Sequence, residues 1–200
     1  MNSDTAIELV IVQHAQARRE PGDPGLTDTG RQAAATTARF LARTPWDALY
    51  SSPLRRALET AAAIGDACRL ETTVDDRLRE RINWGSAPQP QGWDTFLAEW
   101  NRSSEQRDWV PTAGESSEAT GARMLEAISD CVANAVGPHV LVVSHAGATV
   151  DLLRTLLGDE AVEAAAPGVI ADGIPNCALT RLAFNRSWRA ESIARTTHLG

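Results

Sequence analysis

Two histidines occupy nearly the same position in the pattern of the chain, each directly after a short apolar run. His14 follows residues 8–13, Glu-Leu-Val-Ile-Val-Gln, and His145 follows residues 139–144, His-Val-Leu-Val-Val-Ser. Apolar, β-branched runs of this length are typical of buried strands in α/β sheets. Ligands of open α/β sheets bind just beyond the carboxyl ends of the strands. We therefore expect the two imidazoles to meet in one pocket.

The rest of the chain alternates between strand and helix patterns over 200 residues, a length suited to one domain. This alternation predicts an α/β fold, a three-layer α/β/α sandwich with a mostly parallel central sheet. A hairpin around Asn185-Arg186 is expected to add an antiparallel edge. The expected strands are 7–13, 46–50, 70–74, 139–144, 177–184 and 188–195. The expected helices are 29–43 after a Thr27 cap, 53–67 from Pro53, 116–135 after a serine cap, and 147–157 ending at Gly158.

One stretch, 77–113, has no clear periodicity. It holds Trp84, Trp93, Trp100 and Trp109 with Gly and Pro between them. An insertion this long in a compact domain usually forms a lid or a binding segment. We predict a single domain over 1–200 with an irregular, lid-like insertion at 77–113. Trp84 and Trp93 lie downstream of Glu80, and two interpretations stay open for them: packing within the fold, or the wall of a leaving-group pocket.

Composition narrows the classes of function and location. The net charge of −7 disfavours nucleic-acid binding, and the 19 cationic residues are all Arg, which excludes Schiff-base chemistry on lysine. No segment approaches the roughly 20 apolar residues that cross a membrane. The N-terminus is polar and acidic rather than like a signal peptide, and three widely spaced cysteines predict free thiols in a reducing compartment. We expect a cytoplasmic protein, and the sequence permits a homodimer.

Two further segments carry candidate chemistry. Arg55 and Arg56 fall in the first turn of an expected helix, where the helix dipole favours anions. A bound anion, held by guanidinium and backbone N–H groups, would explain an arginine pair there. Glu80 lies among arginines at 77–81, and a carboxylic acid can protonate a departing alkoxide. With two imidazoles, these residues indicate phosphoryl transfer.

Taken in order, these segments resemble the histidine phosphatase superfamily, with its phosphoglycerate mutase-like fold. The resemblance spans nearly the whole chain, and the ordered set of motifs is far more specific than any single one. The Arg-His-Gly signature corresponds to Gln13-His14-Ala15. The remaining motifs correspond to Leu26-Thr27-Asp28-Thr29-Gly30, Ser51 to Ala61, Leu78-Arg79-Glu80, Gly114-Glu115-Ser116, Ser144-His145-Ala146-Gly147 and Asn176-Cys177.

The resemblance implies a role for each matched residue. His14 would be the nucleophile that becomes phosphohistidine, and Arg56 and His145 would hold the non-bridging oxygens. Glu80 would protonate the leaving group and then activate water. The resemblance implies no metal and no cofactor, because fixed cations neutralise the phosphoryl oxygens. The expected partner is a small phosphorylated substrate.

Three departures from the family motifs affect the expected phosphate site. Gln13 takes the place of an Arg and can donate amide hydrogen bonds but supplies no charge. Losing the charged hydrogen bond costs about 1.5–3 kcal/mol, or about ten- to a hundredfold in rate or affinity. We hypothesise that Arg18 or Arg19 restores the charge. Ala15 and Ala146 stand for Gly and would be strained only at positive φ. The expected substrate-binding residues are therefore Gln13, Arg18, Arg56, His145 and Ala146.

Several functions remain compatible with these residues. A metal-independent phosphomonoesterase that acts on a small phosphorylated metabolite is favoured. A phosphoglycerate mutase would use the same residues, although the short chain and Gln13 favour hydrolysis. Gln13 also leaves open a pseudophosphatase that binds a phosphorylated ligand or a protein partner. A zinc hydrolase built on His14, His145 and Glu80 is the remaining alternative.

Overall fold

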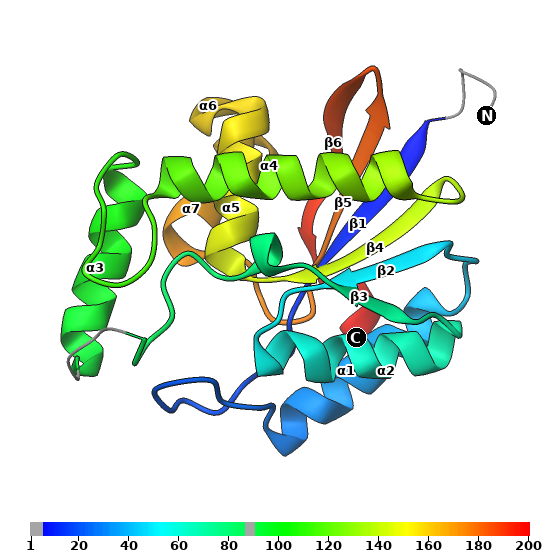
Figure 1. Cartoon of the computed structure of the whole chain (residues 1–200), viewed down its shortest axis with the longest axis horizontal. Coiled ribbons are helices and arrows are strands. Elements are labelled where there is room, and N and C mark those ends of the chain that lie inside the picture. The colour runs from blue at the N-terminus through cyan, green and yellow to red at the C-terminus, as the bar shows by residue number, and fades with distance from the viewer. Residues whose placement is uncertain (1–5, 87–90) are drawn as a thin grey trace.

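The computed structural model describes residues 6–86 and 91–200. A six-stranded mixed sheet with the order β3-β2-β4-β1-β5-β6 lies between two helical layers (Figure 1). The first four of these strands run parallel, and β5 and β6 run antiparallel at one edge. The predicted α/β sandwich with an antiparallel edge is confirmed. The strands are β1 (Ile7–Gln13), β2 (Ala48–Ser51), β3 (Thr72–Val74), β4 (His139–Ser144), β5 (Leu179–Asn185) and β6 (Ser187–Arg195).

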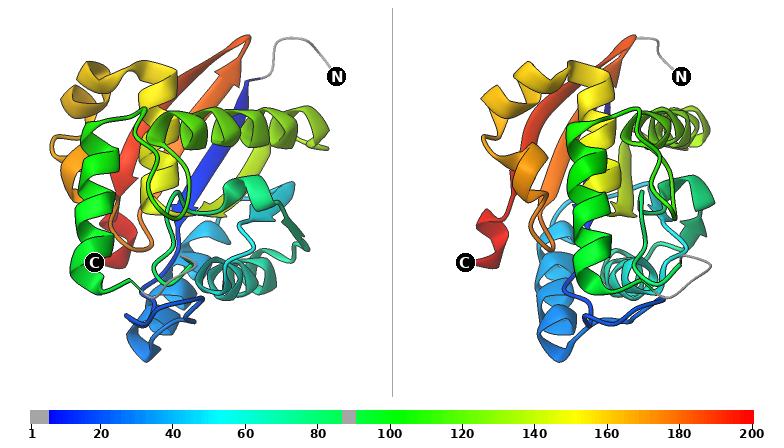
Figure 2. Two further views of the ribbon diagram at one scale, coloured as in Figure 1. Left: turned by 60° about the vertical axis from the view of Figure 1, so that its left-hand side comes forward. Right: turned by 90° about the vertical axis from the view of Figure 1, so that its left-hand side faces the viewer.

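The helices divide between the two faces of the sheet (Figures 1 and 2). One layer holds α1 (Asp28–Leu41) and α2 (Arg55–Cys68), and the other holds α4 (Ser117–Asn134) and α5 (Ala146–Leu157). Helix α3 stands at the end of the molecule toward which the parallel strands run. The shorter elements are α3 (Trp93–Glu105), α6 (Asp159–Ala165), α7 (Val169–Asp172) and two single 3₁₀ turns at Asp76–Leu78 and Thr197–Leu199.

The alternation of side chains along β1 builds the two halves of the core. Leu9 and Ile11 pack into the cluster under α4 and α5, while Val10 and Val12 pack against α1 and α2. All four are almost fully buried, as expected for a central strand covered on both faces. Burying one such side chain contributes roughly 1.5–3 kcal/mol. The alternation fixes the register that sets His14 at the strand end.

The sequence missed one long helix. Segment 77–113 is not irregular throughout, because α3 occupies 93–105. Trp93, Phe96, Leu97 and Trp100 have the i, i+3, i+4, i+7 spacing of a helix face, and the nearby Gly and Pro residues obscured it. The short helices α6 and α7 were not predicted either. The two 3₁₀ turns were not predicted, and the other helices and strands were predicted with end shifts of up to two residues.

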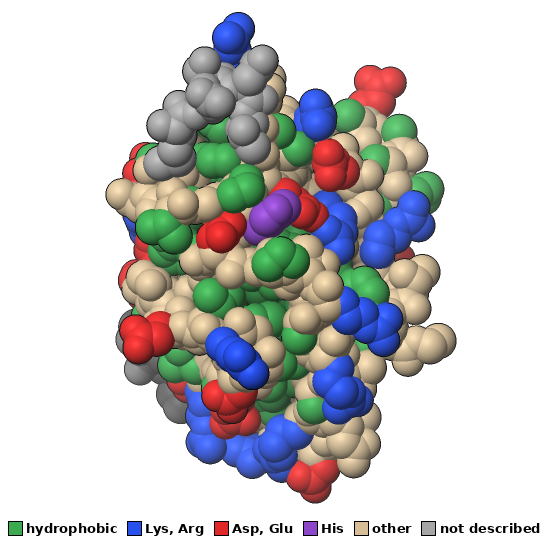
Figure 3. Space-filling view, turned by 90° about the vertical axis from the view of Figure 1, so that its right-hand side faces the viewer, with side chains coloured by type: hydrophobic (Ala, Val, Ile, Leu, Met, Phe, Trp, Pro, Cys, Tyr) green, Lys and Arg blue, Asp and Glu red, His purple; other side chains and the backbone are tan. Residues whose placement is uncertain are grey.

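The sheet register brings three strand ends together. β1 and β4 pair in parallel so that Gln13 lies opposite Ser144, and β2 pairs with β4 so that Ser51 lies opposite Val143. The residues that follow these strands, on β1, β4 and β2, therefore emerge side by side. Figure 3 shows the opposite end, where the parallel strands begin; there Arg, Asp and Glu side chains are scattered among apolar ones.

No helix among residues 6–86 and 91–200 is both long and apolar enough to cross a membrane.

Candidate active site

The two strand-end histidines meet as the sequence predicted. Their ring centroids lie 5.1 Å apart, with a tilt of 58° between the ring planes. The backbone N–H of His14 donates to the carbonyl of Ser144 at 3.1 Å, which continues the β1–β4 ladder by one residue. The position of both imidazoles therefore follows directly from the sheet register.

The ring of His14 is held in one tautomer. Its Nδ1 lies 2.8 Å from the carbonyl oxygen of Ala15, which can only accept, so Nδ1 carries the proton. Nε2 then presents its lone pair and accepts a hydrogen bond from Nε of Arg56 at 3.2 Å. Burial, together with the positive charge of Arg56, lowers the pKa of His14 to about 3. The imidazole is therefore neutral at physiological pH, the form required of a nucleophile.

This lowered pKa gives the stability of the protein a defined pH dependence. An unfolded chain protonates His14 below about pH 6.5, whereas the folded chain does so only near the lowered pKa of about 3. Protons therefore favour the unfolded state within this window, and stability falls as the pH drops through it. We expect urea unfolding of wild type to lose more stability between pH 7 and pH 4.5 than that of His14→Ala. Equal losses in the two proteins would contradict a neutral His14.

Arg56, rather than Arg55, reaches His14. The Arg56 side chain is buried, and its Nη1 donates to Oδ1 of Asn83 at 3.0 Å. Asn83 in turn donates from Nδ2 to the carbonyl of Gly22 at 2.6 Å. Arg55 instead pairs with Glu59 at 2.7 Å on the exposed side of α2. The buried guanidinium is thus fixed from both sides and aimed at Nε2 of His14.

The N-terminus of α5 holds the carboxylate of Glu80. Its oxygens accept hydrogen bonds from the backbone N–H groups of Gly147 at 3.2 Å and of Ala148 and Arg81 at 2.9 and 2.8 Å. The first-turn amides of a helix have no partner within the helix, so a buried carboxylate there satisfies them. The 3₁₀ turn before Glu80 is tied to the sheet, because Oγ of Ser144 donates to the carbonyl of Leu78 at 2.9 Å.

His145 is fully buried beside Ser52. The Ser52 hydroxyl lies 2.6 Å from Nε2 of His145 and accepts the backbone N–H of Leu54 at 3.2 Å. Because the hydroxyl oxygen already accepts from Leu54, we assign its own proton to a hydrogen bond donated to Nε2 of His145. Nε2 is then an acceptor, and the ring carries its proton on Nδ1. Nδ1 is buried and has no hydrogen-bond partner among the described residues. Burial, with Arg56 and His14 nearby, holds the pKa of His145 well below 6.5.

The structure separates the other predicted substrate-binding residues. Arg18 lines the same cavity as His14 and pairs with Glu20 at 3.5 Å. Gln13 is buried, and its Oε1 has no partner among the described residues. The lining of the cavity does not include Gln13, His145 or Ala146, and His145 is fully buried. Neither Ala15 nor Ala146 has a positive φ, so alanine in place of the usual glycine strains neither backbone.

A cavity of about 420 Å³ opens beside His14, a size typical of small-molecule sites. Its lining falls into three groups, which we call the floor with the reactive side chains, the loop 16–24, and an aromatic wall that this loop touches through Arg19 and Trp93. Trp84 and Trp93, for which the sequence left the pocket wall open as one of two interpretations, both line this cavity. The floor comprises His14, Arg56, Glu80, Asn83 and Asn176, and the aromatic wall comprises Ile82, Trp84, Trp93, Phe96 and Trp100.

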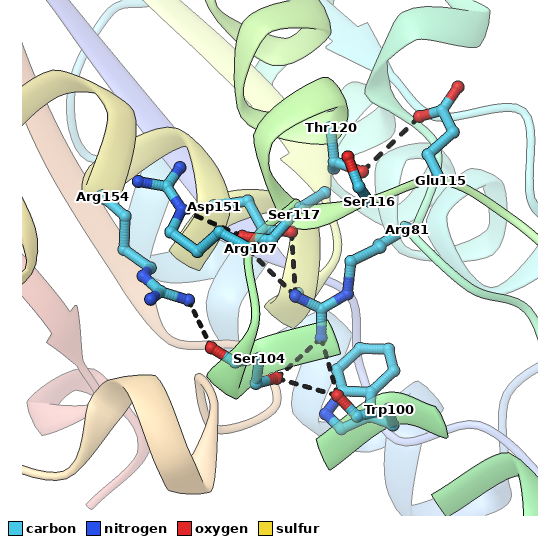
Figure 4. Close-up of polar contacts among 12 residues, drawn as sticks. Arg81, Trp100, Ser104, Arg107, Glu115, Ser116, Ser117, Thr120, Asp151 and Arg154 are labelled. Atoms are coloured by element: carbon cyan, nitrogen blue, oxygen red, sulfur yellow. Dashed lines mark hydrogen bonds and ion pairs between the residues drawn. The ribbon is translucent and has the colours of Figure 1, made fainter. Parts of the chain in front are cut away.

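A buried polar cluster fixes the helix that carries this aromatic wall (Figure 4). Arg81 donates from Nη1 to both carboxylate oxygens of Asp151 at 3.0 Å and from Nη2 to Oγ of Ser104 on α3 at 2.8 Å. The guanidinium also lies 4.6 Å from the ring centroid of Trp100. The Arg81 and Asp151 side chains are 2% and 0% exposed, and breaking such a pair costs about 3–5 kcal/mol. Helix α3 is therefore tied to α5 and to the residue that follows Glu80.

Among the described residues, no three His, Cys, Asp or Glu side chains lie close enough together to hold a metal ion. His14, His145 and Glu80, which the sequence left open as a zinc site, therefore do not form such a group.

Comparison with known families decides the classification. The model of the histidine phosphatase superfamily, branch 1, matches residues 9–194. The chain belongs to the histidine phosphatase superfamily. Membership agrees with the resemblance of the ordered motifs, and it makes this chain a phosphatase or phosphotransferase.

Relatives of this histidine phosphatase have several different names. A probable phosphoglycerate mutase, GpmB, of Yersinia pestis (strain Pestoides F) is 31% identical over 215 aligned positions, covering 96% of this chain and 95% of the relative. The native structure of a mycobacterial glucosyl-3-phosphoglycerate phosphatase is 26% identical with a TM-score of 0.77, covering 96% and 100%. A phosphoserine phosphatase of Entamoeba histolytica shares the fold at 20% identity and a TM-score of 0.75, covering 96% and 99%.

Sequence reasoning missed several residues of the histidine phosphatase site. Ser52 belongs to the Ser-Ser-Pro segment, but its contact with His145 depends on the pairing of β2 with β4. Asn83 lies in the segment that gave no periodic signal. Asn176 was noticed only as the entry to the last strands, and its Nδ2 donates to the carbonyl of His14 at 2.9 Å. Each contact joins residues far apart in the chain.

Proposed function

We propose that this histidine phosphatase hydrolyses a small phosphomonoester through a phosphohistidine formed at Nε2 of His14. One observation carries the proposal: the neutral imidazole has its proton on Nδ1 and its Nε2 lone pair beside the Arg56 guanidinium. A phosphoryl group bound by that guanidinium lies against the lone pair. This arrangement supports attack by nitrogen on phosphorus.

The reaction proceeds in two balanced steps. Glu80 enters the first step protonated. Nε2 forms a bond to phosphorus, the bond from phosphorus to the ester oxygen breaks, and Glu80 gives its proton to the departing oxygen and becomes the carboxylate held by the N–H groups at the start of α5. Water then attacks phosphorus, Glu80 takes a proton from it, and the bond from Nε2 to phosphorus breaks. The products are an alcohol and inorganic phosphate, with His14 and Glu80 returned to their starting states.

The charge of the phosphoryl group is met by donors that already surround the floor of the cavity. Arg56 transfers its Nε hydrogen bond from His14 to a phosphoryl oxygen. The hydrogen bond to Asn83 keeps the Arg56 guanidinium in place. His145 donates from Nδ1, the buried nitrogen that has no partner in the described chain. Gln13 and Ala146 are neighbours in the chain of His14 and His145 and do not line the cavity. Arg18 lines it and, turned from Glu20 to the phosphoryl group, supplies the positive charge that Gln13 lacks.

Product analysis separates hydrolysis from mutase activity. We expect wild type to release inorganic phosphate from p-nitrophenyl phosphate and from members of a phosphometabolite panel, with no requirement for added metal. With 3-phosphoglycerate, formation of 2-phosphoglycerate without net phosphate release would overturn the proposal in favour of a mutase, the activity named for the Yersinia relative. A wild type as inactive as its own His14→Ala variant would instead favour a pseudophosphatase.

A further inference from the structure

The aromatic wall begins beside the residue assigned as the acid. A Cβ added at Gly147 would lie 2.7 Å from Oε1 of Glu80 and 2.6 Å from Cη2 of Trp100, so both groups converge on the bare backbone of this glycine. The oxygen that Glu80 protonates belongs to the leaving group. The indole of Trp100 therefore borders the space that the first atoms of the leaving group occupy.

From Trp100 the aromatic wall continues through neighbouring rings. Ring centroids lie 6.0 Å apart between Trp100 and Phe96, 5.2 Å between Phe96 and Trp93, and 5.1 Å between Trp93 and Trp84. Phe96 is buried, but the three tryptophans are only half-buried and line the cavity. This surface offers π faces and apolar area, with few groups that could hydrogen-bond a small polar leaving group.

Arg19, from the loop 16–24, completes this end of the cavity. Its guanidinium carbon lies 3.8 Å from the ring centroid of Trp93, a stacking distance. Arg19 forms no ion pair with a carboxylate in residues 6–86 and 91–200, although the adjacent Arg18 pairs with Glu20. The planar guanidinium of Arg19 and the indoles present flat surfaces of the same cavity.

We propose that the leaving group of the substrate carries an aromatic ring, bound among the indoles of Trp84, Trp93 and Trp100 and the guanidinium of Arg19. The inference rests on the phosphomonoesterase function proposed above and specifies its substrate class. A ring in this position buries apolar area against the wall and interacts with Arg19 through its π face. A glycerate-sized leaving group would leave these faces uncovered.

The test compares two alkyl phosphates with leaving alcohols of similar acidity, so that chemical reactivity does not dominate. We expect kcat/KM for 2-phenylethyl phosphate to exceed that for propyl phosphate by about 10- to 100-fold, the effect of burying one ring. Trp84→Ala and Trp93→Ala should reduce this ratio to a few-fold. Trp109→Ala is the matched control, because Arg102 stacks over Trp109 at 4.6 Å in the same segment and Trp109 does not line the cavity. It should leave the ratio unchanged.

The outcomes distinguish this inference from the proposed function. Turnover of both esters that depends on His14, with a ratio near one, would overturn the aromatic substrate class and leave the phosphatase function standing. Absence of turnover would count against the function, and the inference would then be tested by calorimetric binding. There, 2-phenylethylphosphonate should bind at least about tenfold more tightly than propylphosphonate, and Trp93→Ala should remove the difference. Equal affinities would refute the inference whatever the activity.

Discussion

Replacement of His14 by alanine is expected to lower kcat for every phosphomonoester substrate by at least about 10⁴-fold, equivalent to some 5 kcal/mol of barrier. The change removes Nε2, the atom that the proposed mechanism bonds to phosphorus, and leaves Arg56 and Glu80 in position to bind. Measured kcat should therefore fall far more than substrate affinity. Steady-state kinetics over a range of substrate concentrations will separate the two effects.

The matched control for this change is His139→Ala. His139 starts β4 at the opposite end of the sheet, where its Nδ1 lies 3.2 Å from Glu8. We expect its kcat to stay within about threefold of wild type. Thermal unfolding of His14→Ala at pH 7 should show a folded protein, because the removed ring packs at the edge of the site rather than in the core. A folded His14→Ala protein with more than a tenth of wild-type kcat would refute the role given to His14.

Replacement of Glu80 by glutamine is expected to lower kcat for alkyl phosphates by about 10²- to 10⁴-fold, the usual contribution of general acid–base catalysis. Glutamine keeps the size of the side chain but cannot transfer a proton to the leaving oxygen. Its amide also loses one of the two oxygens that accept the N–H groups of Gly147, Ala148 and Arg81. Part of the loss therefore comes from a less well-fixed N-terminus of α5.

The dependence on the leaving group distinguishes these two causes. Nitrophenolate departs without a proton, so Glu80→Gln should affect p-nitrophenyl phosphate much less than an alkyl phosphate in the step that phosphorylates His14. A disordered α5 N-terminus would slow both substrates equally. The exposed Glu71→Gln serves as the control for a charge change elsewhere. Equal losses of burst rate with the two substrates would contradict the assignment of Glu80 as the acid.

The parts of the site that lie in sequence motifs could be predicted, because regular pairing converts sequence position into spatial position. Each apolar run forms a buried strand, and a histidine follows directly where the strand ends. The register of β1 and β4 therefore brings His14 next to His145. Arg56 could be distinguished from Arg55 by the motif, and helical spacing explains why they point to different sides of α2.

The remaining features depend on contacts that no local pattern encodes. Helix α3 has a recognisable apolar face, but its position is set by Arg81, Asp151 and Ser104, from three separate segments. The Ser52 contact that orients His145 spans 93 residues. The motif placed Gln13 near the phosphate site. It did not indicate that the side-chain oxygen of Gln13 is buried without a hydrogen-bond partner in the described chain.

The most direct test of the account is to trap the covalent intermediate. Wild type mixed with a ³²P-labelled phosphomonoester and quenched in alkaline denaturant within milliseconds should carry label that survives alkali and is lost in acid. Peptide mapping and ³¹P NMR should place the phosphoryl group on Nε2 of His14, since Nδ1 is occupied by its hydrogen bond to Ala15. Label on another side chain or on Nδ1, or substrate turnover in which His14→Ala traps as much label as wild type, would contradict it.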